Sequence, residues 1–121
     1  MQPCFVIPVY NHTDCLVALV AYLTGFQLPI IMVNDGSESV CSTLLHQLAK
    51  DNSLLDLVEH EKNLGKGQAV ITGLRYAHQH GYSHALQLDA DGQHDWKDIQ
   101  HFLDSAEQHP NAMIIGQPVF D

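Results

Sequence analysis

Short apolar runs alternate with amphipathic stretches along the chain. The runs at 4–8, 30–33, 54–59, 84–88 and 112–115 have the length and composition typical of strands in a buried sheet. Between them, apolar residues recur at helical spacing, first at Leu16, Leu19, Val20 and Leu23. The same spacing marks three later segments, with Cys41, Leu44, Leu45 and Leu48, then Val70, Leu74 and Ala77, and then Ile99, Phe102, Leu103 and Ala106. The pattern predicts five strands and four helices in alternation.

Strands joined by helical crossovers are typical of a mainly parallel sheet with helices on both faces. The sequence therefore predicts a three-layer, Rossmann-like α/β fold. With 121 residues and 45% hydrophobic composition, the chain has material for one compact core. We expect a single domain over residues 1–121.

Polar clusters follow the first four predicted strands. They contain Tyr10-Asn11, Asn34 to Ser37, Asn63 to Gly67, and Asp89 to Gly92. The carboxyl ends of parallel strands meet at one edge of a sheet, and ligands of such folds bind there near a topological switch point. The four clusters are therefore expected to share one ligand-binding edge.

Asp89 and Asp91 lie at i and i+2 after the fourth strand, so in extended backbone their side chains share a face. Two carboxylates about 5 Å apart repel by roughly 3 kcal/mol, and a divalent cation reverses that repulsion. Oxygen ligands with Gln93 nearby suit Mg²⁺ or Mn²⁺ better than Zn²⁺. The alternative is an ordinary Asp-Gly turn with solvated carboxylates.

Asp35 and the segment 63–67 each allow two interpretations. Asp35 either caps the next helix or accepts hydrogen bonds from a nucleoside. The segment is either an ordinary glycine loop or a phosphate loop, with glycines for close approach and Lys66 as a point charge. It matches neither the Walker A pattern nor the G-x-G-x-x-G fingerprint.

Charge and cysteine content limit the partners. Five Lys and Arg against fourteen Asp and Glu give a net charge of −9, which disfavours nucleic acid and an unaided anionic membrane surface. Three cysteines without a C-x-x-C pair favour a reducing, cytoplasmic location. The apolar run at 16–23 is too short to span a bilayer. Most of the nine histidines are expected in solvated or capping roles.

Five segments together resemble a family 2 glycosyltransferase of the GT-A fold, in the branch similar to dolichol-phosphate-mannose synthases. They are IPVYN at 7–11, VNDGS at 33–37, NLGKGQA at 63–69 with Gly73, LDADGQH at 88–94, and GQPVFD at 116–121. They keep the family's order from one end of the chain to the other.

The resemblance implies inverting transfer of a sugar from a nucleotide-diphosphate donor to an acceptor such as a polyprenyl phosphate or a saccharide. It implies a divalent metal, Mg²⁺ or Mn²⁺, at Asp89, Asp91 and Gln93. It also implies a donor pocket formed by Pro8, Tyr10, Asn11, Asp35, Lys66 and Asp89.

Three features depart from the family pattern. His12 replaces a Glu of many relatives, and Trp96 stands near a frequent Pro. The chain also stops at Asp121, before the strands that carry acceptor contacts and any catalytic base. We therefore expect the nucleotide-binding half of the domain, inactive alone, self-associating through an uncovered sheet edge, and membrane-associated in a longer protein.

Other functions fit less well. A haloacid-dehalogenase-like phosphatase would use Asp89 as nucleophile and Asp91 as acid, but Gln93 replaces the expected Thr or Val and the later motifs are missing. A sugar nucleotidyltransferase would need a glycine-rich basic loop after the first strand. An EF-hand would need glycine at the sixth loop position, and Gly92 is fourth. A non-catalytic nucleotide-binding module stays open.

Overall fold

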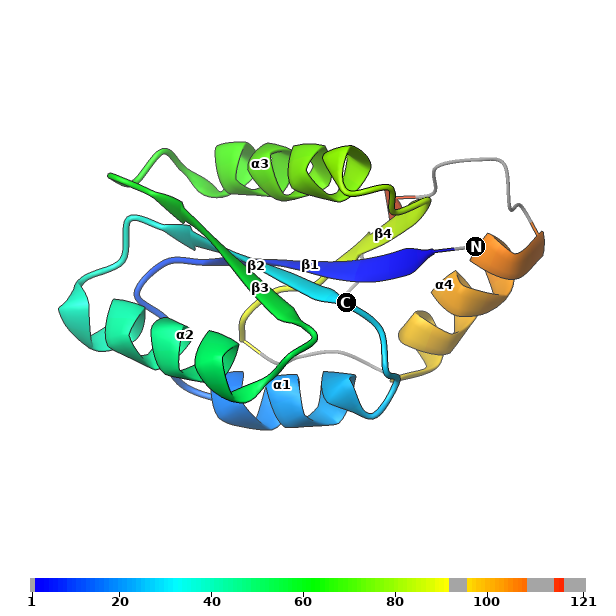
Figure 1. The fold of residues 1–121 in the computed structure, drawn as a ribbon, viewed down its shortest axis with the longest axis horizontal. Helices are drawn as coiled ribbons and strands as arrows, with labels where there is room; N and C mark the ends of the chain where they lie inside the picture. Colours follow the sequence, from blue (N-terminus) through cyan, green and yellow to red (C-terminus); the bar gives the residue numbers. More distant parts are fainter. Residues whose placement is uncertain (1, 92–95, 109–114, 117–121) are drawn as a thin grey trace.

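The computed structural model describes residues 2–91, 96–108 and 115–116. Strands and helices alternate along them (Figure 1) in the order β1 (Pro3–Val9), α1 (Leu16–Thr24), β2 (Ile30–Asp35), α2 (Ser39–Asp51), β3 (Leu55–His60), α3 (Lys66–Gln79), β4 (His84–Gln87), α4 (Trp96–Gln108) and β5 (Ile115–Gly116). The predicted alternation is confirmed, with small shifts at strand ends. Residues 112–114 of the fifth predicted strand and the segment 117–121 lie outside the described residues.

The strands form one parallel sheet in the order β3-β2-β1-β4-β5. The chain builds the sheet outward from β1 to β3, crosses back, and continues from β4 on the other side of β1. The switch point therefore lies between β1 and β4. In folds of this kind the crevice at the carboxyl ends of those two strands is the favoured place for a ligand.

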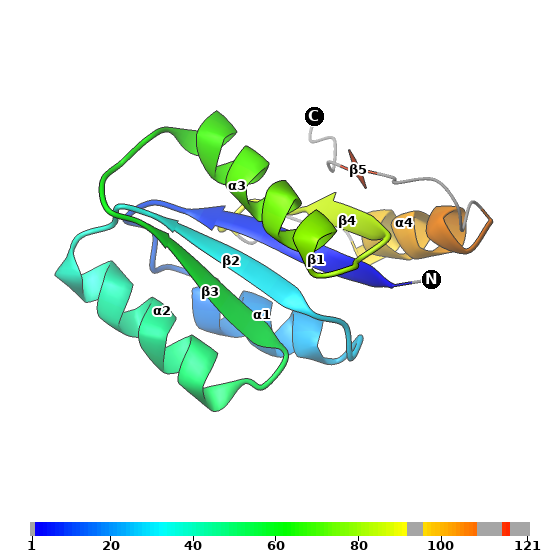
Figure 2. The ribbon, with the colours of Figure 1, turned by 45° about the horizontal axis from the view of Figure 1, so that its top comes forward.

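The two faces of the sheet carry separate apolar clusters, because successive strand residues point to opposite sides. Phe5, Ile7 and Met32 lie in the larger cluster, which α1, α2 and α4 cover. Val6 and Val33 lie in the smaller cluster, which α3 covers. Figure 2 shows α3 on one side of the sheet and α1 and α2 on the other. The predicted three-layer α/β architecture is confirmed.

Helix α3 packs very closely on the sheet through Gly73. A Cβ at this position would overlap Cγ1 of Val6 and would lie 3.2 Å from Cγ2 of Val33. Ala69 and Ala77, one turn before and after, are also fully buried. The stripe of small residues fixes the height of α3 above β1 and β2, and with it the position of the helix's first turn.

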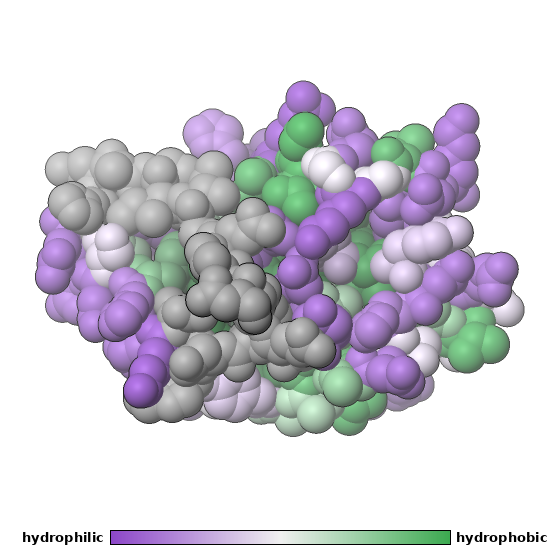
Figure 3. Space-filling view, turned by 180° about the vertical axis from the view of Figure 1, so that it is seen from behind, coloured by the Kyte–Doolittle hydropathy of each residue, from purple (hydrophilic) through white to green (hydrophobic). Residues whose placement is uncertain are grey.

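Polar residues cover most of the described surface on the face drawn in Figure 3, with hydrophobic residues in separate patches. The large apolar side chains that are exposed come from several elements and loops: Tyr10, Val17, Tyr22, Val40, Leu64 and Ile71. Within the described ranges, every helix falls short of the length and apolar content needed to cross a bilayer.

Candidate functional site

A pocket of about 330 Å³ opens at the carboxyl ends of β1, β2 and β4, beside the switch point. The start of α3 closes it on one side. Its lining is Pro8, Val9, Tyr10, His12, Asp35, Asn63, Lys66, Ala69, Asp89, Ala90 and Asp91. Four segments that the sequence placed at one edge of the sheet therefore contribute to one cavity.

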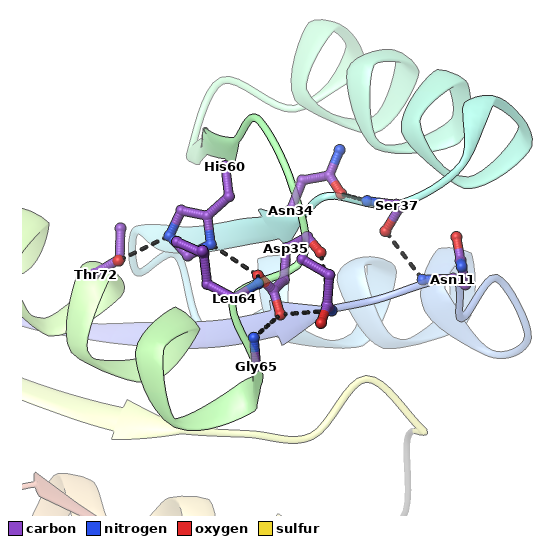
Figure 4. A network of polar contacts seen from close by, with 9 residues as sticks. Asn11, Asn34, Asp35, Ser37, His60, Leu64, Gly65 and Thr72 are labelled. Carbon is purple, nitrogen blue, oxygen red and sulfur yellow. Dashed lines mark hydrogen bonds and ion pairs between the residues drawn. The ribbon is translucent and has the colours of Figure 1, made fainter.

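Asp35, the last residue of β2, lines this pocket but is only 2% exposed. Its Oδ1 accepts hydrogen bonds from His60 Nδ1 and from the Leu64 amide, both at 2.8 Å. Its Oδ2 accepts from Asn63 Nδ2 and from the Gly65 amide, both at 3.0 Å. Figure 4 shows the loop between β3 and α3 wrapped around this carboxylate. Asp35 thereby fixes the conformation of residues 63–65.

His60 reaches Asp35 because the two residues are register partners at the ends of β3 and β2. Both point to the face that α3 covers, since Asp35 follows Ile31 and Val33 at alternate positions. On α3, Thr72 Oγ1 lies 2.9 Å from the other ring nitrogen, Nε2. A partly buried chain of polar contacts therefore runs from Thr72 through His60 to Asp35.

A second polar group joins the loop after β1 to the loop after β2. The Asn11 side chain accepts a hydrogen bond from the Glu38 amide at 2.6 Å, and Ser37 Oγ accepts one from the Asn11 amide at 3.0 Å. Asn34 Oδ1 in turn accepts from the Ser37 amide at 3.0 Å. Asn11, predicted to line the donor pocket, lies beside it and uses its side chain at the start of α2.

Asp89 and Lys66 meet across the pocket. Lys66 Nζ lies 2.6 Å from Asp89 Oδ1, which also accepts from Gln87 Nε2 at 3.1 Å. The Lys66 side chain is 58% exposed and that of Asp89 25% exposed. Asp91 is exposed and lines the same pocket. The Lys66 ammonium therefore pairs with one oxygen of the Asp89 carboxylate in the pocket wall.

The backbone around these two aspartates differs from the extended form that the sequence predicted. Strand β4 ends at Gln87, and Ala90 and Asp91 form a turn. Ala90, between the carboxylates, is buried. The two carboxylates therefore line one pocket because the chain turns there, and strand alternation is not the cause. Gln93 lies outside the described residues.

A divalent cation bound with a diphosphate fits this donor set. Within residues 2–91, 96–108 and 115–116, no three His, Cys, Asp or Glu side chains gather as a metal site. Mg²⁺ and its relatives, however, commonly bind through one or two carboxylates, with phosphate oxygens and water completing the shell. Asp89 and Asp91 supply those carboxylates, and the ammonium of Lys66 at Asp89 marks where positive charge is favoured.

Two further features suit a polar ligand. Nε2 of His12 is buried in the pocket wall and meets no hydrogen-bond partner among the described residues. Gly65 and Gly67, at the start of α3, leave open space where a Cβ would lie, with no described atom within 4 Å. The pocket wall thus offers an unmatched ring nitrogen, and the two glycines that flank Lys66 leave the backbone beside the pocket uncovered.

The groups whose pKa is clearly shifted lie toward the opposite end of the sheet. Burial and the hydrogen bond to Asp56 raise the pKa of Tyr76 to about 12. Burial also raises the pKa of the Cys4 thiol to about 12. Neither group belongs to the lining of the pocket.

Sequence reasoning missed His60 and Thr72. In the sequence His60 is one of several scattered histidines. Its role becomes visible only when the register of β2 on β3 pairs it with Asp35. The available signal was that the two strands end at Asp35 and His60, but strand ends are the least certain feature of a sequence pattern.

The model of glycosyl transferase family 2 matches residues 4–121 of this chain. The chain belongs to glycosyltransferase family 2. It is 28% identical to a UDP-N-acetylglucosamine–dolichyl-phosphate N-acetylglucosaminyltransferase of Methanococcus voltae over 94% of this chain and 51% of the relative. It is 29% identical to a polyprenol monophosphomannose synthase of Mycolicibacterium smegmatis over 90% of this chain and 42% of the relative. The chain thus spans about half the length of these curated relatives.

Among solved structures, the mannosyltransferase PcManGT of Pyrobaculum calidifontis, in complex with GDP-Man and Mn²⁺, superimposes with a TM-score of 0.65. The match covers 74% of this chain and 27% of that one at 23% identity. The likeness shows that the domain has the GT-A fold.

Proposed function

We propose that this domain binds a nucleotide-diphosphate sugar through a divalent cation held by Asp89 and Asp91, for inverting transfer of the sugar to an acceptor. The observation that carries the proposal is the pocket at the switch point, where these two carboxylates and Lys66 come together. Family membership supplies the reaction class, and the acidic chain explains why a cation is needed to bind a diphosphate.

Different residues of the pocket bind different parts of the donor. Asp89 and Asp91 hold Mg²⁺ or Mn²⁺, with Gln93 as the third candidate ligand, and Lys66 turns from Asp89 toward a phosphate oxygen. Pro8, Tyr10 and Asp35 form the nucleoside end, where His12 offers its buried Nε2. When bound, the cation offsets negative charge on the departing nucleoside diphosphate. The bare backbone at Gly65 and Gly67 lets the diphosphate approach the first turn of α3.

The relatives suggest the class of acceptor. The two curated relatives described above are named for dolichyl phosphate and polyprenol monophosphate chemistry. We propose a polyprenyl phosphate as acceptor, with a saccharide as the alternative. Because the chain spans about half the length of these relatives, the acceptor side and the activity of the isolated 121 residues stay predictions.

Ligand-induced stabilisation tests the donor proposal. The melting temperature is measured with UDP, GDP and their sugars, each with and without Mn²⁺, on the wild type, Asp91→Ala and the control Asp104→Ala, an exposed residue of α4. One nucleotide is expected to stabilise the wild type and the control only when Mn²⁺ is present, by about 3 kcal/mol at a hundredfold excess over Kd. Equal stabilisation of Asp91→Ala would contradict the assigned metal site.

Two further expectations remain predictions. Self-association would appear in light scattering as a mass above that of one chain. A cytoplasmic location is consistent with Cys4, Cys15 and Cys41, all of which are free thiols.

A further inference from the structure

The carboxylate of Asp35 is fully occupied by the protein's own donors. A carboxylate offers about four lone-pair sites. The His60 ring and the Leu64 amide use Oδ1, and the Asn63 side chain and the Gly65 amide use Oδ2. A nucleoside group that hydrogen-bonded to this carboxylate would have to displace one of them. Besides lining the nucleoside end of the pocket, Asp35 is therefore an anchor of the loop.

The neighbours of the His60 ring determine which of its two nitrogens donates a hydrogen bond and which accepts one. A carboxylate only accepts, so Nδ1, at 2.8 Å from Asp35, carries a proton. In the neutral ring Nε2 is then the acceptor, and the Thr72 hydroxyl donates to it at 2.9 Å. The His60 side chain is only 9% exposed. Thr72 thus fixes the ring so that its Nδ1–H points at Asp35.

The anchored loop leads directly to Lys66. Gly65, whose amide is bound to Asp35, immediately precedes Lys66, whose ammonium reaches Asp89 on the far side of the pocket. Gly36 adds a second constraint, because a Cβ there would overlap the backbone of Lys62 and Asn63. The position of Lys66 over the pocket therefore depends on how the loop is held at the end of β2.

We propose that His60 and Thr72 are positioning residues for the donor pocket. They hold the Asp35 carboxylate, which holds residues 63–65 and so places Lys66 and the first turn of α3. The pocket wall includes Asp35, Asn63 and Lys66, while His60 and Thr72 lie behind Asp35. The proposal rests on the proposed function only where it concerns ligand affinity; the effect on the loop stands by itself.

Three variants test separately the contact between His60 and Asp35 and the contact between Thr72 and His60. His60→Asn keeps an amide donor near the place of Nδ1 but loses the contact to Thr72. His60→Leu loses both contacts. Thr72→Val keeps the shape of the side chain and removes only the hydroxyl. The controls are His78→Asn on the exposed side of α3 and Thr43→Val on the exposed side of α2.

Two measurements are made on each variant. The first is hydrogen exchange of the Leu64 and Gly65 amides without ligand, followed by NMR and compared with amides of β1. The second is the Kd for UDP and for GDP in the presence of Mn²⁺. His60→Leu is expected to speed exchange of the two loop amides about tenfold while the β1 amides keep their protection. The Kd of the preferred nucleotide should rise about tenfold, equivalent to 1.4 kcal/mol.

Intermediate behaviour of the other variants supports the mechanism. His60→Asn should recover most of the loop protection, and Thr72→Val should lose about threefold in both measurements. If His60→Leu does not fold, Thr72→Val and His60→Asn carry the test.

Loop exchange in all three variants that matches the two controls would overturn the proposal. If the wild type binds neither nucleotide with Mn²⁺, the proposed donor fails, and the exchange data still decide the role of His60 and Thr72.

Discussion

Asp35 and Asp89 belong to similar short sequences, NDGS and DADG, and line the same pocket, yet their carboxylates have opposite surroundings. Asp35 is 2% exposed and accepts four hydrogen bonds from the next loop. Asp89 is more exposed and contacts the exposed side chain of Lys66. A buried aspartate that accepts from backbone amides fixes the shape of the site, whereas one paired with an exposed lysine can exchange that partner for a ligand.

The comparison predicts that removing the two carboxylates affects stability very differently. Asp35→Ala should lower the free energy of unfolding by about 2–4 kcal/mol, because four donors lose a buried acceptor. Asp89→Ala should lower it by only about 1 kcal/mol, because the ion pair with the exposed Lys66 is largely solvated and the hydrogen bond from Gln87 is a smaller loss than the four bonds of Asp35. Urea unfolding followed by circular dichroism measures both values. Similar losses of unfolding free energy in the two variants would show that the two carboxylates do not differ in their contribution to stability.

Close packing at the end of β2 predicts the next largest effect. Gly36 and Gly81 both have positive φ, at 70° and 81°, but only the Gly36 Cβ would strike a neighbouring loop. Gly36→Ala should cost about 2–3 kcal/mol, from left-handed backbone strain together with overpacking. Gly81→Ala, the matched control, should cost about 1 kcal/mol from strain alone. Equal losses in chemical denaturation would mean that the loop is free to retreat from Gly36.

The exchangeable partner of Asp89 predicts a smaller effect, on binding. Lys66→Met should raise the affinity for Mn²⁺ alone up to about fivefold, because the cation no longer competes with an ammonium for Asp89. The same change should weaken Mn²⁺–nucleotide binding, because a phosphate partner is lost. Calorimetric titrations of Lys66→Met are compared with those of Lys50→Met, an exposed lysine of α2. A fall in affinity for both ligands would show that Lys66 holds the metal residues in place.

The smallest effect concerns the reactivity of the cysteine thiols. It should differ between Cys15, near the pocket end of the sheet, and Cys4, in the core. Cys15, exposed in the loop after β1, should react with a thiol reagent at neutral pH. Cys4 is fully buried, and its raised pKa keeps it protonated, so it should react only after unfolding. Because its pKa rises from 9.0 to about 12 on folding, the stability that this shift contributes is complete below pH 9 and is lost as the pH approaches 12. Rapid labelling of Cys4 in the native protein would contradict its burial.

The fold was predictable because its strands β1, β2 and β4 are buried on both faces. Runs such as Ile30–Val33 can hardly be anything else between two amphipathic helices, and the polar clusters after the strands marked the binding edge. The family resemblance carried by those clusters is confirmed by the match over residues 4–121. These features depend on local patterns, which one sequence contains.

The role of each aspartate was less predictable, because it depends on contacts between distant segments. The pairing of Asp35 with His60 requires the register of β2 on β3, and the turn at Ala90 and Asp91 replaced the expected extended backbone. The close approach of a phosphate to Gly65 and Gly67 stays a prediction, whereas the tight packing of Gly36 and Gly73 against other segments of the chain was not predicted.

A paramagnetic NMR titration tests the central claim most directly. Mn²⁺ is added in substoichiometric amounts with the preferred nucleoside diphosphate, and line broadening of the backbone amides is mapped on the wild type. The account predicts broadening centred on Asp89, Ala90 and Asp91 and extending to Lys66, with the Leu64 and Gly65 amides still protected by Asp35. Broadening centred on Asp35, or release of those two amides on binding, would contradict it.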